Sequence, residues 1–274
     1  DELKKSAQGR ARVALIVAEP LAPRISGVDL GDAEVFTFTI ADGEAGKSSA
    51  SLLKVWDWLG AAGFTRSDLI VGIGGGATTD FAGFAAATWL RGIDWIAIPT
   101  TVAGAVDAAV GGKTAINSDY GKNLIGSFHS PISVIVDVDF LQTLSLRDIS
   151  AGMAEVIKCG FIADPEILKL SSGCTAQTLL SDRELLIDLI YRALRVKATV
   201  VSSDFKESFA REALNYGHTL GHAIEIHAKY QLRHGEAVSI GMVFVAELAA
   251  ARGLIDTSAV ALHRDLLSRF GLPT

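Results

Sequence analysis

The sequence predicts an α/β protein, in which a mostly parallel sheet flanked by helices is followed by an all-helical part. Apolar, strand-like runs alternate with helix-like segments over the first half of the chain, and this alternation is typical of parallel sheets. After about residue 145, helical periodicity continues without a convincing strand, and glycine becomes less frequent. These observations place a domain boundary near residue 145 and give predicted domains over 1–145 and 146–274.

The predicted strands of the first half are mostly short apolar runs. Arg12–Ala18 (RVALIVA) is apolar after its first residue, as expected of a parallel strand that is buried on both faces. Asp68–Ile73 (DLIVGI) has the same character and leads straight into three glycines. Further strands are predicted over Glu34–Ile40, Trp95–Ile98 and Val134–Val138, and helices over Ser49–Ala62 and Thr78–Leu90.

The second half is predicted to contain six helices. In each of them apolar residues recur at the spacing of an amphipathic helix. The predicted helices cover Arg147–Cys159, Glu166–Leu170, Asp182–Ser202, Ala210–Tyr230, Glu236–Arg252 and Ser258–Phe270.

The composition indicates a globular protein with a sizeable core. Of the 274 residues, 49% are apolar and 20% are charged, which argues against disorder. The net charge of −6 argues against nonspecific binding of nucleic acid. Cys159 and Cys174 have no metal-type spacing, which favours reduced thiols and a cytoplasmic location. We expect no membrane span, since no apolar run approaches about 20 residues, and no leader, since no charged segment followed by an apolar one opens the chain.

The histidines of the second half form the strongest candidate for a chemical site. His218 and His222 are four residues apart, which places them on one face of a helix, and Arg211 and Asn215 precede them at helical spacing. His234 opens the motif HGE further along the chain. Two or three histidines that converge with a carboxylate from elsewhere make a catalytic zinc site with one open position. The alternative is a pair of surface histidines on an amphipathic helix.

Two glycines favour the metal site over that alternative. Gly217 and Gly221 each precede a histidine, and each costs about 1 kcal/mol of helix stability relative to alanine. Such a cost indicates that something approaches the backbone closely there.

A glycine-rich turn in the first half is a candidate phosphate-binding site. Residues Gly72–Gly76 (GIGGG) lie between a predicted strand and a predicted helix, where free N–H groups of the helix N-terminus can bind a pyrophosphate. Thr100 and Thr101 follow the next strand, at the edge where parallel-sheet proteins bind nucleotides. The alternative is a purely structural turn, because Ala77 breaks the usual glycine spacing.

Several charged residues have both an ordinary and a functional interpretation. Glu155 and Lys158 share a helix face, as a surface ion pair or as a zinc-binding carboxylate beside a substrate-binding cation. Lys197 and Arg211 are cations in rather apolar predicted helices. Other polar residues lie on a long glycine-containing loop, where simple solvation would also explain them: Lys113, Lys122 and Asn123.

Taken together, these motifs resemble the 3-dehydroquinate synthase family of sugar phosphate cyclases, over most of the chain and in the family's order. The matching segments are DGEAGK (42–47), GGGATTDFAGFAAATWLRG (74–92), PTT (99–101), VDAAVGGKT (106–114), GKNLIGSFH (121–129), MAEVIK (153–158), VKATVVSSD (196–204), LNYGHTLGHAIE (214–225) and HGEAVSIGM (234–242).

The resemblance implies a Rossmann-like parallel-sheet NAD domain over 1–145 and an all-helical metal- and substrate-binding domain over 146–274. It implies an active site in the cleft between them and a homodimer. The implied ligands of zinc or cobalt are Glu155, His218 and His234. The implied substrate residues are His222, Lys158, Lys197, Arg211, Asn215, Lys113, Asp107 and Asn123, with Arg91 donated across the dimer interface. The implied NAD contacts are Asp42, Glu44, Lys47, Gly75, Gly76, Asp80, Thr100, Thr101, Lys113, Lys122, Phe140 and Thr143.

The family's reaction accounts for these residue types. It converts 3-deoxy-D-arabino-heptulosonate 7-phosphate to 3-dehydroquinate and phosphate, with transient oxidation by NAD⁺, elimination of phosphate, return of the hydride and closure of the ring. The substrate's phosphate and carboxylate require several cations, whereas the neutral side chains can hydrogen-bond hydroxyl groups.

Two features depart from the family pattern. Glu19 stands near the position where the family usually has an aspartate beside the adenosine ribose. The chain ends at Thr274, where family members continue with a lysine-rich segment. We therefore expect part of the C-terminal region to be missing, with NAD and metal binding retained and turnover poor.

Three other functions stay open at this point. An epi-valiolone synthase would use the same chemistry on a substrate without a carboxylate. The presence of Lys197, Arg211 and Asn215 favours the dehydroquinate reaction over it. A polyol dehydrogenase would release NADH, and its metal ligands are usually an aspartate with histidines. A non-catalytic NAD-binding module is supported only by the short C-terminus.

Overall fold

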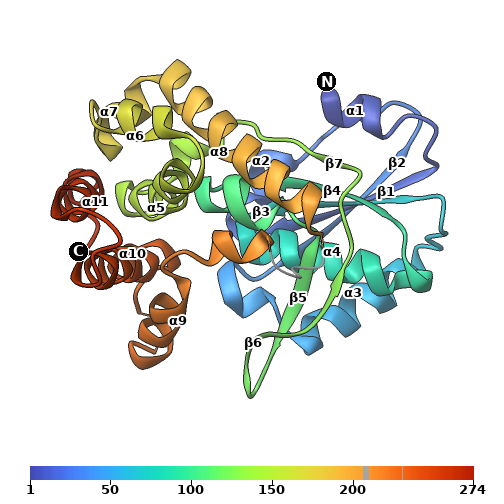
Figure 1. Ribbon diagram of the computed structural model, residues 1–274. Coiled ribbons are helices and arrows are strands. Elements are labelled where there is room, and N and C mark those ends of the chain that lie inside the picture. Colours follow the sequence, from blue (N-terminus) through green and yellow to red (C-terminus); the bar gives the residue numbers. More distant parts are fainter. Residues whose placement is uncertain (206–209, 230) are drawn as a thin grey trace. The chain divides into compact units, whose positions relative to one another are not determined.

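The computed structural model describes residues 1–205, 210–229 and 231–274, which form two compact units (Figure 1). The first unit comprises Asp1–Asp137 and the second comprises Val138–Thr274. Each unit has its own architecture: a sheet with helices in the first, and helices alone in the described residues of the second.

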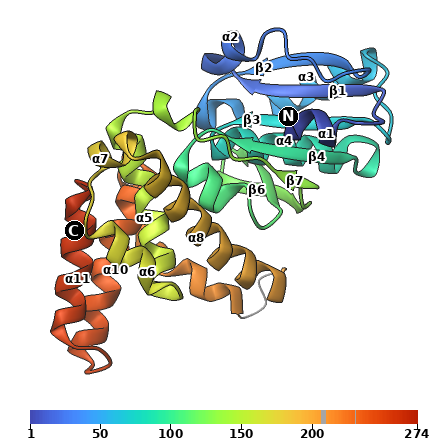
Figure 2. The ribbon, with the colours of Figure 1, turned by 90° about the horizontal axis from the view of Figure 1, so that it is seen from above.

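The first unit is built on a five-stranded parallel sheet, in the order β2-β1-β3-β4-β7 (Figure 2). Parallel pairing brings the carboxyl ends of the strands to one edge, where β3 ends in Gly74 beside Pro99 of β4. The predicted α/β fold class is thereby confirmed. The strands are β1 (Arg12–Ala18), β2 (Glu34–Ile40), β3 (Leu69–Gly74), β4 (Asp94–Pro99) and β7 (Ser133–Val134).

Helices pack against this sheet through a shared apolar core. Ser48 caps the N-terminus of α3 (Ser49–Ala61) by accepting a hydrogen bond from the backbone of Ser51. Helix α4 (Gly76–Thr88) buries Phe81 in the same core as Ile16 and Trp95. The remaining helical segments of the unit are α1 (Glu2–Ser6), η1 (Glu19–Leu21), α2 (Ala22–Ile25), η2 (Gly43–Gly46), η3 (Trp89–Arg91) and η4 (Gly104–Ala108).

Two predictions for this unit are wrong. The predicted strand Val134–Val138 is only the two-residue β7, because the chain then leaves the sheet and enters the second unit. The predicted long loop is a hairpin of β5 (Lys113–Ser118) and β6 (Gly121–Phe128). Its glycines and polar residues hide the alternation of a strand, and α4 accommodates β5 because Gly83 lies beside Thr114, where a Cβ would be 2.5 Å from the threonine methyl.

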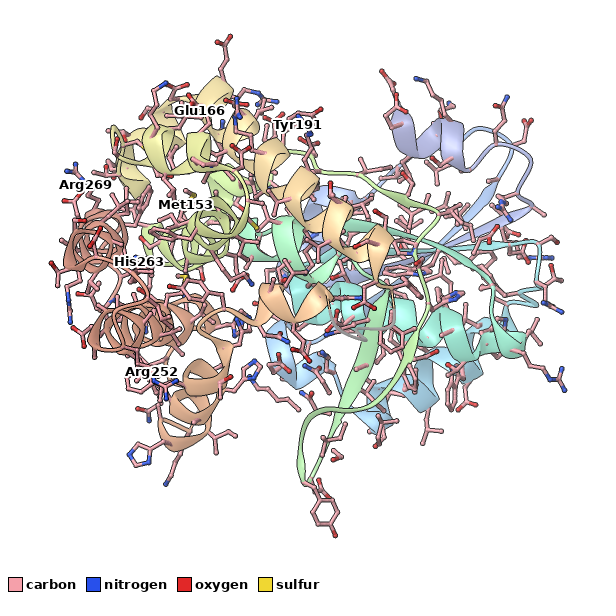
Figure 3. All side chains as sticks on the ribbon, viewed as in Figure 1. Met153, Glu166, Tyr191, Arg252, His263 and Arg269 are labelled. Atoms are coloured by element: carbon pink, nitrogen blue, oxygen red, sulfur yellow. The ribbon has the colours of Figure 1, made fainter. Side chains whose placement is uncertain are left out.

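The second unit contains seven α-helices and two short helical turns in its described residues. Met153 points into its interior, whereas Tyr191 lies at its surface (Figure 3). Helix α7 lies in a segment where no helix was predicted. The helical segments are η5 (Leu141–Thr143), α5 (Leu146–Ile162), α6 (Pro165–Ser171), α7 (Ala176–Ser181), α8 (Arg183–Ser203), η6 (Ala210–Asn215), α9 (His218–His227), α10 (His234–Ala251) and α11 (Thr257–Arg269).

The single helix predicted over Ala210–Tyr230 is wrong, because the chain breaks at Gly217. That glycine has φ +79° and separates η6 from α9, and this left-handed conformation ends a helix. Arg211 and Asn215 therefore do not continue the helix face of His218. Tyr230, the predicted end of the helix, lies outside the described residues.

Two glycines allow the main chain of α10 to contact the main chain of neighbouring segments directly. A Cβ on Gly235 would lie 1.8 Å from the carbonyl oxygen of Ala151 in α5, and one on Gly241 would lie 1.9 Å from that of Gly217. The expected close approach at Gly217 is thus made by α10. By length and composition alone α10 could cross a membrane, but half of it is buried inside the protein, as in the core helix of a soluble domain.

Candidate functional site

Three helices bring one carboxylate and two imidazoles together in the second unit. Glu155 lies in α5, His218 is the first residue of α9 and His234 is the first residue of α10. Glu155 Oε1 lies 3.7 Å from His218 Nε2 and 3.5 Å from His234 Nε2, and the three donor atoms all lie within 4.8 Å of one another. The structure therefore assembles the three predicted metal ligands, which are far apart in the sequence.

The close helix packing explains why these three side chains meet. Gly235, next to His234, touches Ala151, which lies one turn before Glu155 on α5. Gly241 of the same helix touches Gly217, the residue before His218. Helix α10 thus contacts the backbone beside each of the other two donors.

In each imidazole, the nitrogen that does not face Glu155 makes a hydrogen bond. His218 Nδ1 lies 3.2 Å from the backbone oxygen of Tyr216. His234 Nδ1 lies 3.1 Å from Glu225 Oε2. Because both acceptors are oxygens, Nδ1 carries a hydrogen in each ring. Nε2, the nitrogen that faces Glu155, is then the atom that can bind a metal ion in place of a proton.

Glu155 and Lys158 form a buried pair, so the surface ion pair considered from the sequence is wrong. Lys158 Nζ lies 2.5 Å from Glu155 Oε2, and both side chains are 2% exposed. Burial alone would raise the pKa of Glu155, but Lys158 and the two imidazoles hold it well below its usual value. Glu155 Oε1 has no hydrogen-bond partner, and a buried carboxylate oxygen in this state calls for a cation.

The electrostatics at His234 also favour a cation. Burial alone would lower the pKa of His234, but the adjacent carboxylates of Glu155 and Glu225 raise it to about 10. The carboxylates that stabilise an imidazolium would equally stabilise a metal ion that replaces the proton.

The donor set fits zinc or cobalt. Donors about 2.1 Å from a tetrahedral ion are about 3.4 Å apart, close to the two distances from Glu155 Oε1. One carboxylate and two imidazoles are three protein ligands, as in sites that keep a position open for substrate.

The other predicted residues of the second unit lie at different distances from these donors. The ring of His222 is centred 5.3 Å from that of His218 and 5.9 Å from that of His234. Lys197 is buried in α8. Arg211 is buried and donates to the backbone oxygen of Phe205 at 2.8 Å, whereas Asn215 is exposed at the end of η6.

In the first unit, predicted cofactor residues form a polar network that joins η2, α4 and the β5–β6 hairpin. Lys47 Nζ lies 2.8 Å from Asp80 Oδ2 and also donates to Asn123 Oδ1. Burial raises the pKa of Asp80 to about 6, although Lys47 acts in the opposite direction. Glu44 Oε2 accepts a hydrogen bond from Asn117 at 2.6 Å, and its Oε1 lies 3.8 Å from the ammonium of Lys122.

The glycine turn and the threonines lie at the carboxyl edge of the sheet. Thr100 donates its backbone N–H to the oxygen of Gly74 at 2.8 Å, which ties the ends of β3 and β4 together. A Cβ on Gly74 would lie 2.6 Å from Thr78, and one on Gly76 would lie 2.9 Å from Ala108. Packing thus requires these two glycines, while Gly75 is the N-cap of α4 beside Thr101.

The remaining predicted residues are spread over both units. Asp107 is in η4, Lys113 is exposed at the start of β5, and Asp42 is exposed before η2. Arg91 is exposed and has φ +68°. Phe140 and Thr143 belong to the second unit, where the Thr143 hydroxyl donates to the Phe140 oxygen at 2.7 Å.

Two residues of these networks were missed in the sequence. Glu225 lies seven residues after His218 and three after His222, so helical spacing already places it on their face. Asn117 had no comparable indication, because its contacts depend on a hairpin that was predicted to be a loop.

Family models describe almost the entire chain. The model of the 3-dehydroquinate synthase N-terminal region matches residues 37–151, and that of the C-terminal region matches residues 152–274. The chain is 53% identical over 270 residues to 3-dehydroquinate synthase of Corynebacterium diphtheriae, covering 97% of this chain and 75% of that protein. It is 56% identical over 240 residues to that of Thermobifida fusca, covering 88% of this chain and 65% of the relative.

Solved structures share the fold over nearly the full chain. A 2-epi-5-epi-valiolone synthase from Streptomyces hygroscopicus, with NAD⁺ and Zn²⁺ bound, has a TM-score of 0.87 and 29% identity, covering 98% of this chain and 77% of its own. A 2-deoxy-scyllo-inosose synthase complexed with carbaglucose-6-phosphate, NAD⁺ and Co²⁺ has a TM-score of 0.84 and 29% identity. The match covers 99% of this chain and 77% of the synthase chain. An iron-containing alcohol dehydrogenase from Thermococcus thioreducens shares the fold, with a TM-score of 0.72 and 17% identity. The match covers 99% of this chain and 82% of the dehydrogenase chain.

Proposed function

Because the chain belongs to the 3-dehydroquinate synthase family, we propose that it converts 3-deoxy-D-arabino-heptulosonate 7-phosphate to 3-dehydroquinate and phosphate, in the shikimate pathway of aromatic amino acid biosynthesis. The observation that carries this proposal is the convergence of Glu155, His218 and His234 in a chain that matches the family over 37–274. The relatives' names supply the substrate, and the donor set supplies a place for the metal.

The cofactors of the proposed reaction are NAD and a divalent metal, zinc or cobalt. Related cyclases have been solved with NAD⁺ and with Zn²⁺ or Co²⁺. When bound, NAD⁺ accepts and returns a hydride, and the metal ion acidifies the hydroxyl that is oxidised. The donor distances and the partnerless Glu155 Oε1 support this assignment of the metal.

The proposed role of Lys158 is to fix Glu155 and to present positive charge to the substrate. Its ammonium holds Oε2 of Glu155, which leaves Oε1 directed at the imidazoles. A lysine ammonium carries a full positive charge and only donates hydrogen bonds, which suits contact with an anionic group of the substrate.

We assign the substrate's anionic groups to cations and its hydroxyls to neutral groups. The buried side chains of Lys197 and Arg211, together with Lys158, suit a phosphate or a carboxylate, because burial strengthens charge-assisted hydrogen bonds. His222 and Asn215 are exposed and able to hydrogen-bond hydroxyls or water. From the first unit, Lys113, Asp107, Asn123 and Arg91 stay proposed substrate residues.

We propose that the first part of the chain, 1–145, binds NAD, and that 146–274 binds the metal and the substrate. Support for the NAD site comes from the polar network around Lys47 and Asp80 and from the threonines at the carboxyl edge of the sheet. The proposed contacts are Asp42, Glu44, Lys47, Gly75, Gly76, Asp80, Thr100, Thr101, Lys113, Lys122, Phe140 and Thr143. We further propose that the protein is cytoplasmic and forms a homodimer. Light scattering of the purified protein tests the dimer.

One assay tests the proposed activity. The protein is incubated with NAD⁺, zinc and the heptulosonate phosphate, and phosphate release and NADH absorbance are followed together. We expect phosphate without accumulating NADH, with dehydroquinate as the product. Accumulating NADH from a simple polyol would instead indicate a dehydrogenase, and NAD binding without either product would indicate a non-catalytic module.

A further inference from the structure

We propose that Glu225 is a positioning residue for the metal site: its carboxylate holds His234 in the tautomer and orientation that bind the cation. This inference rests on the proposed function and adds a residue to it. Glu225 Oε2 lies 3.1 Å from His234 Nδ1, on the opposite side of the ring from the nitrogen that faces Glu155.

The hydrogen bond fixes which nitrogen of His234 can bind a metal. A carboxylate oxygen only accepts, so Nδ1 keeps its hydrogen, and Nε2 is the nitrogen that exchanges a proton for the metal ion. A carboxylate partner also increases the basicity of the ring and restrains its rotation, as carboxylates behind metal-binding histidines do.

The two histidines of the site have different supports. His218 donates from Nδ1 to a backbone oxygen, that of Tyr216, which a side-chain substitution cannot remove. His234 relies on a side chain and is the more exposed of the two, with 34% of its side chain accessible against 10% for His218. Glu225 therefore supports the ligand that packing restrains less.

The carboxylate of Glu225 is mostly buried beside His234. The Glu225 side chain is 10% exposed, and a buried carboxylate needs a charged or hydrogen-bonding partner. It also brings a second negative charge close to the three donors, in addition to that of Glu155.

An alternative is that Glu225 itself binds a cation with His222 and His234, since these three residues could also hold an ion. The 3.1 Å contact between Glu225 and His234 Nδ1 is a hydrogen-bond distance. A site for a second ion would require both nitrogens of His234 to bind metals. The orienting role needs only one ion per chain.

The test is the affinity of the metal-free protein for Zn²⁺ and Co²⁺, measured by competition with a chelating dye. We expect Glu225→Gln to weaken binding about 10- to 100-fold, as for other residues behind a metal ligand, and Glu225→Asp to weaken it less. The control is Glu247→Gln, which makes the same change in α10 about 20 Å along the helix from His234. We expect the control to bind metal as tightly as the wild type.

Two further readouts separate positioning from a general loss of structure. The visible spectrum of Co²⁺ bound to Glu225→Gln should shift, because the geometry around His234 changes. Excess zinc should restore kcat close to the wild-type value, whereas misfolded protein would not be rescued. If Glu225→Gln does not fold, as judged by circular dichroism of the metal-free protein, Glu225→Asp decides by the same measurements.

The outcomes distinguish this inference from the proposed function. Wild-type protein that binds metal and releases phosphate, together with a Glu225→Gln variant of unchanged metal affinity and Co²⁺ spectrum, would overturn the role of Glu225 alone. Two metal ions per wild-type chain would also overturn it, because Glu225 would then be a ligand. Wild-type protein that binds no metal would overturn both.

Discussion

At the scale of single residues, the second unit concentrates buried charge around one carboxylate. Glu155 touches Lys158 through one oxygen and faces two imidazoles with the other. A buried charge that loses its partner is costly, so these groups depend on one another and on the cation that the site would hold. Substitutions of these residues should therefore weaken metal binding far more than they weaken NAD⁺ binding.

The first prediction concerns the metal ligands. We expect His234→Ala and Glu155→Gln each to weaken zinc binding by more than about 100-fold, since loss of a ligand should exceed the loss of a residue behind one. NAD⁺ affinity should stay close to that of the wild type. Metal content by emission spectroscopy and NAD⁺ binding by calorimetry measure the two effects. The exposed His227→Ala on α9 is the control, and equal metal content in all variants would refute the ligand assignment.

The second prediction concerns Asp80 in the first unit. Its pKa is raised from the ordinary 3.8 to about 6, so the folded state binds the proton more tightly than the unfolded chain. The free energy of unfolding therefore contains a favourable contribution at low pH that is lost as the pH rises from about 4 to about 6. At 1.36 kcal/mol per pKa unit, the loss is at most about 3 kcal/mol.

Asp80→Asn provides the reference for this titration. We subtract the unfolding free energy of Asp80→Asn from that of the wild type. This difference should decrease as the pH rises from about 4 to about 6, because only the wild type loses its contribution, and it should be constant above about pH 7. Denaturant unfolding at a series of pH values measures it. A difference that rises with pH instead would show that Lys47 dominates and that the pKa is lowered.

At the scale of elements, the position of α10 determines the site. Its two glycines touch α5 and the residue before α9 at backbone distance, so the spacing of the donors is set by main-chain contacts. Side-chain repacking cannot relieve a methyl group placed between two backbones.

The third prediction follows from this packing. Gly235→Ala should destabilise the second unit by about 3 kcal/mol or more and weaken metal binding, because its Cβ would lie 1.8 Å from the Ala151 oxygen. Gly173→Ala is the control, because a Cβ there would make only an ordinary contact at 3.7 Å. Thermal unfolding of the metal-free variants checks the difference; equal stability of the two would contradict the role of Gly235.

The elements also show what the sequence could reveal. Continuous apolar runs located β1 and β3, because both faces of these strands are buried. The spacing of His218, His222 and the HGE motif indicated a metal site, since metal chemistry restricts the donor types. The break at Gly217 could not be predicted, because it depends on contact with α10, which lies further along the chain. The β5–β6 hairpin was missed because its glycines and polar residues hide the alternation of a strand.

At the scale of the whole molecule, two compact units carry different kinds of site. The polar network of Lys47 and Asp80 belongs to Asp1–Asp137, and the three donor side chains belong to Val138–Thr274. Composition and periodicity predicted a sheet-containing half and an all-helical half with a boundary near residue 145, and the structure divides after Asp137. The assignment of NAD to the first half and of the metal to the second came from the motifs and the family resemblance, and it stays a prediction. The metal and the nucleotide should therefore stabilise different parts of the chain.

The fourth prediction is a pair of separable thermal effects. A ligand at about 100 times its Kd stabilises the state that binds it by about 2.7 kcal/mol. Zinc should raise one calorimetric transition and NAD⁺ the other. The variant His234→Ala serves as the control, because it should lose the response to zinc and keep the response to NAD⁺. A single transition that both ligands shift equally would contradict the assignment of zinc and NAD⁺ to different units.

The glycine contacts of α10 also bear on which ions the protein admits. Large, hard ions such as Ca²⁺ require six to eight oxygen ligands spread at 2.3–2.6 Å. A frame of three helices in main-chain contact cannot widen to gather so many, and two of its three donors are nitrogens. We therefore expect a small ion that prefers nitrogen ligands to bind here in preference to Ca²⁺, because the helix contacts fix the donor spacing and two of the donors are imidazoles.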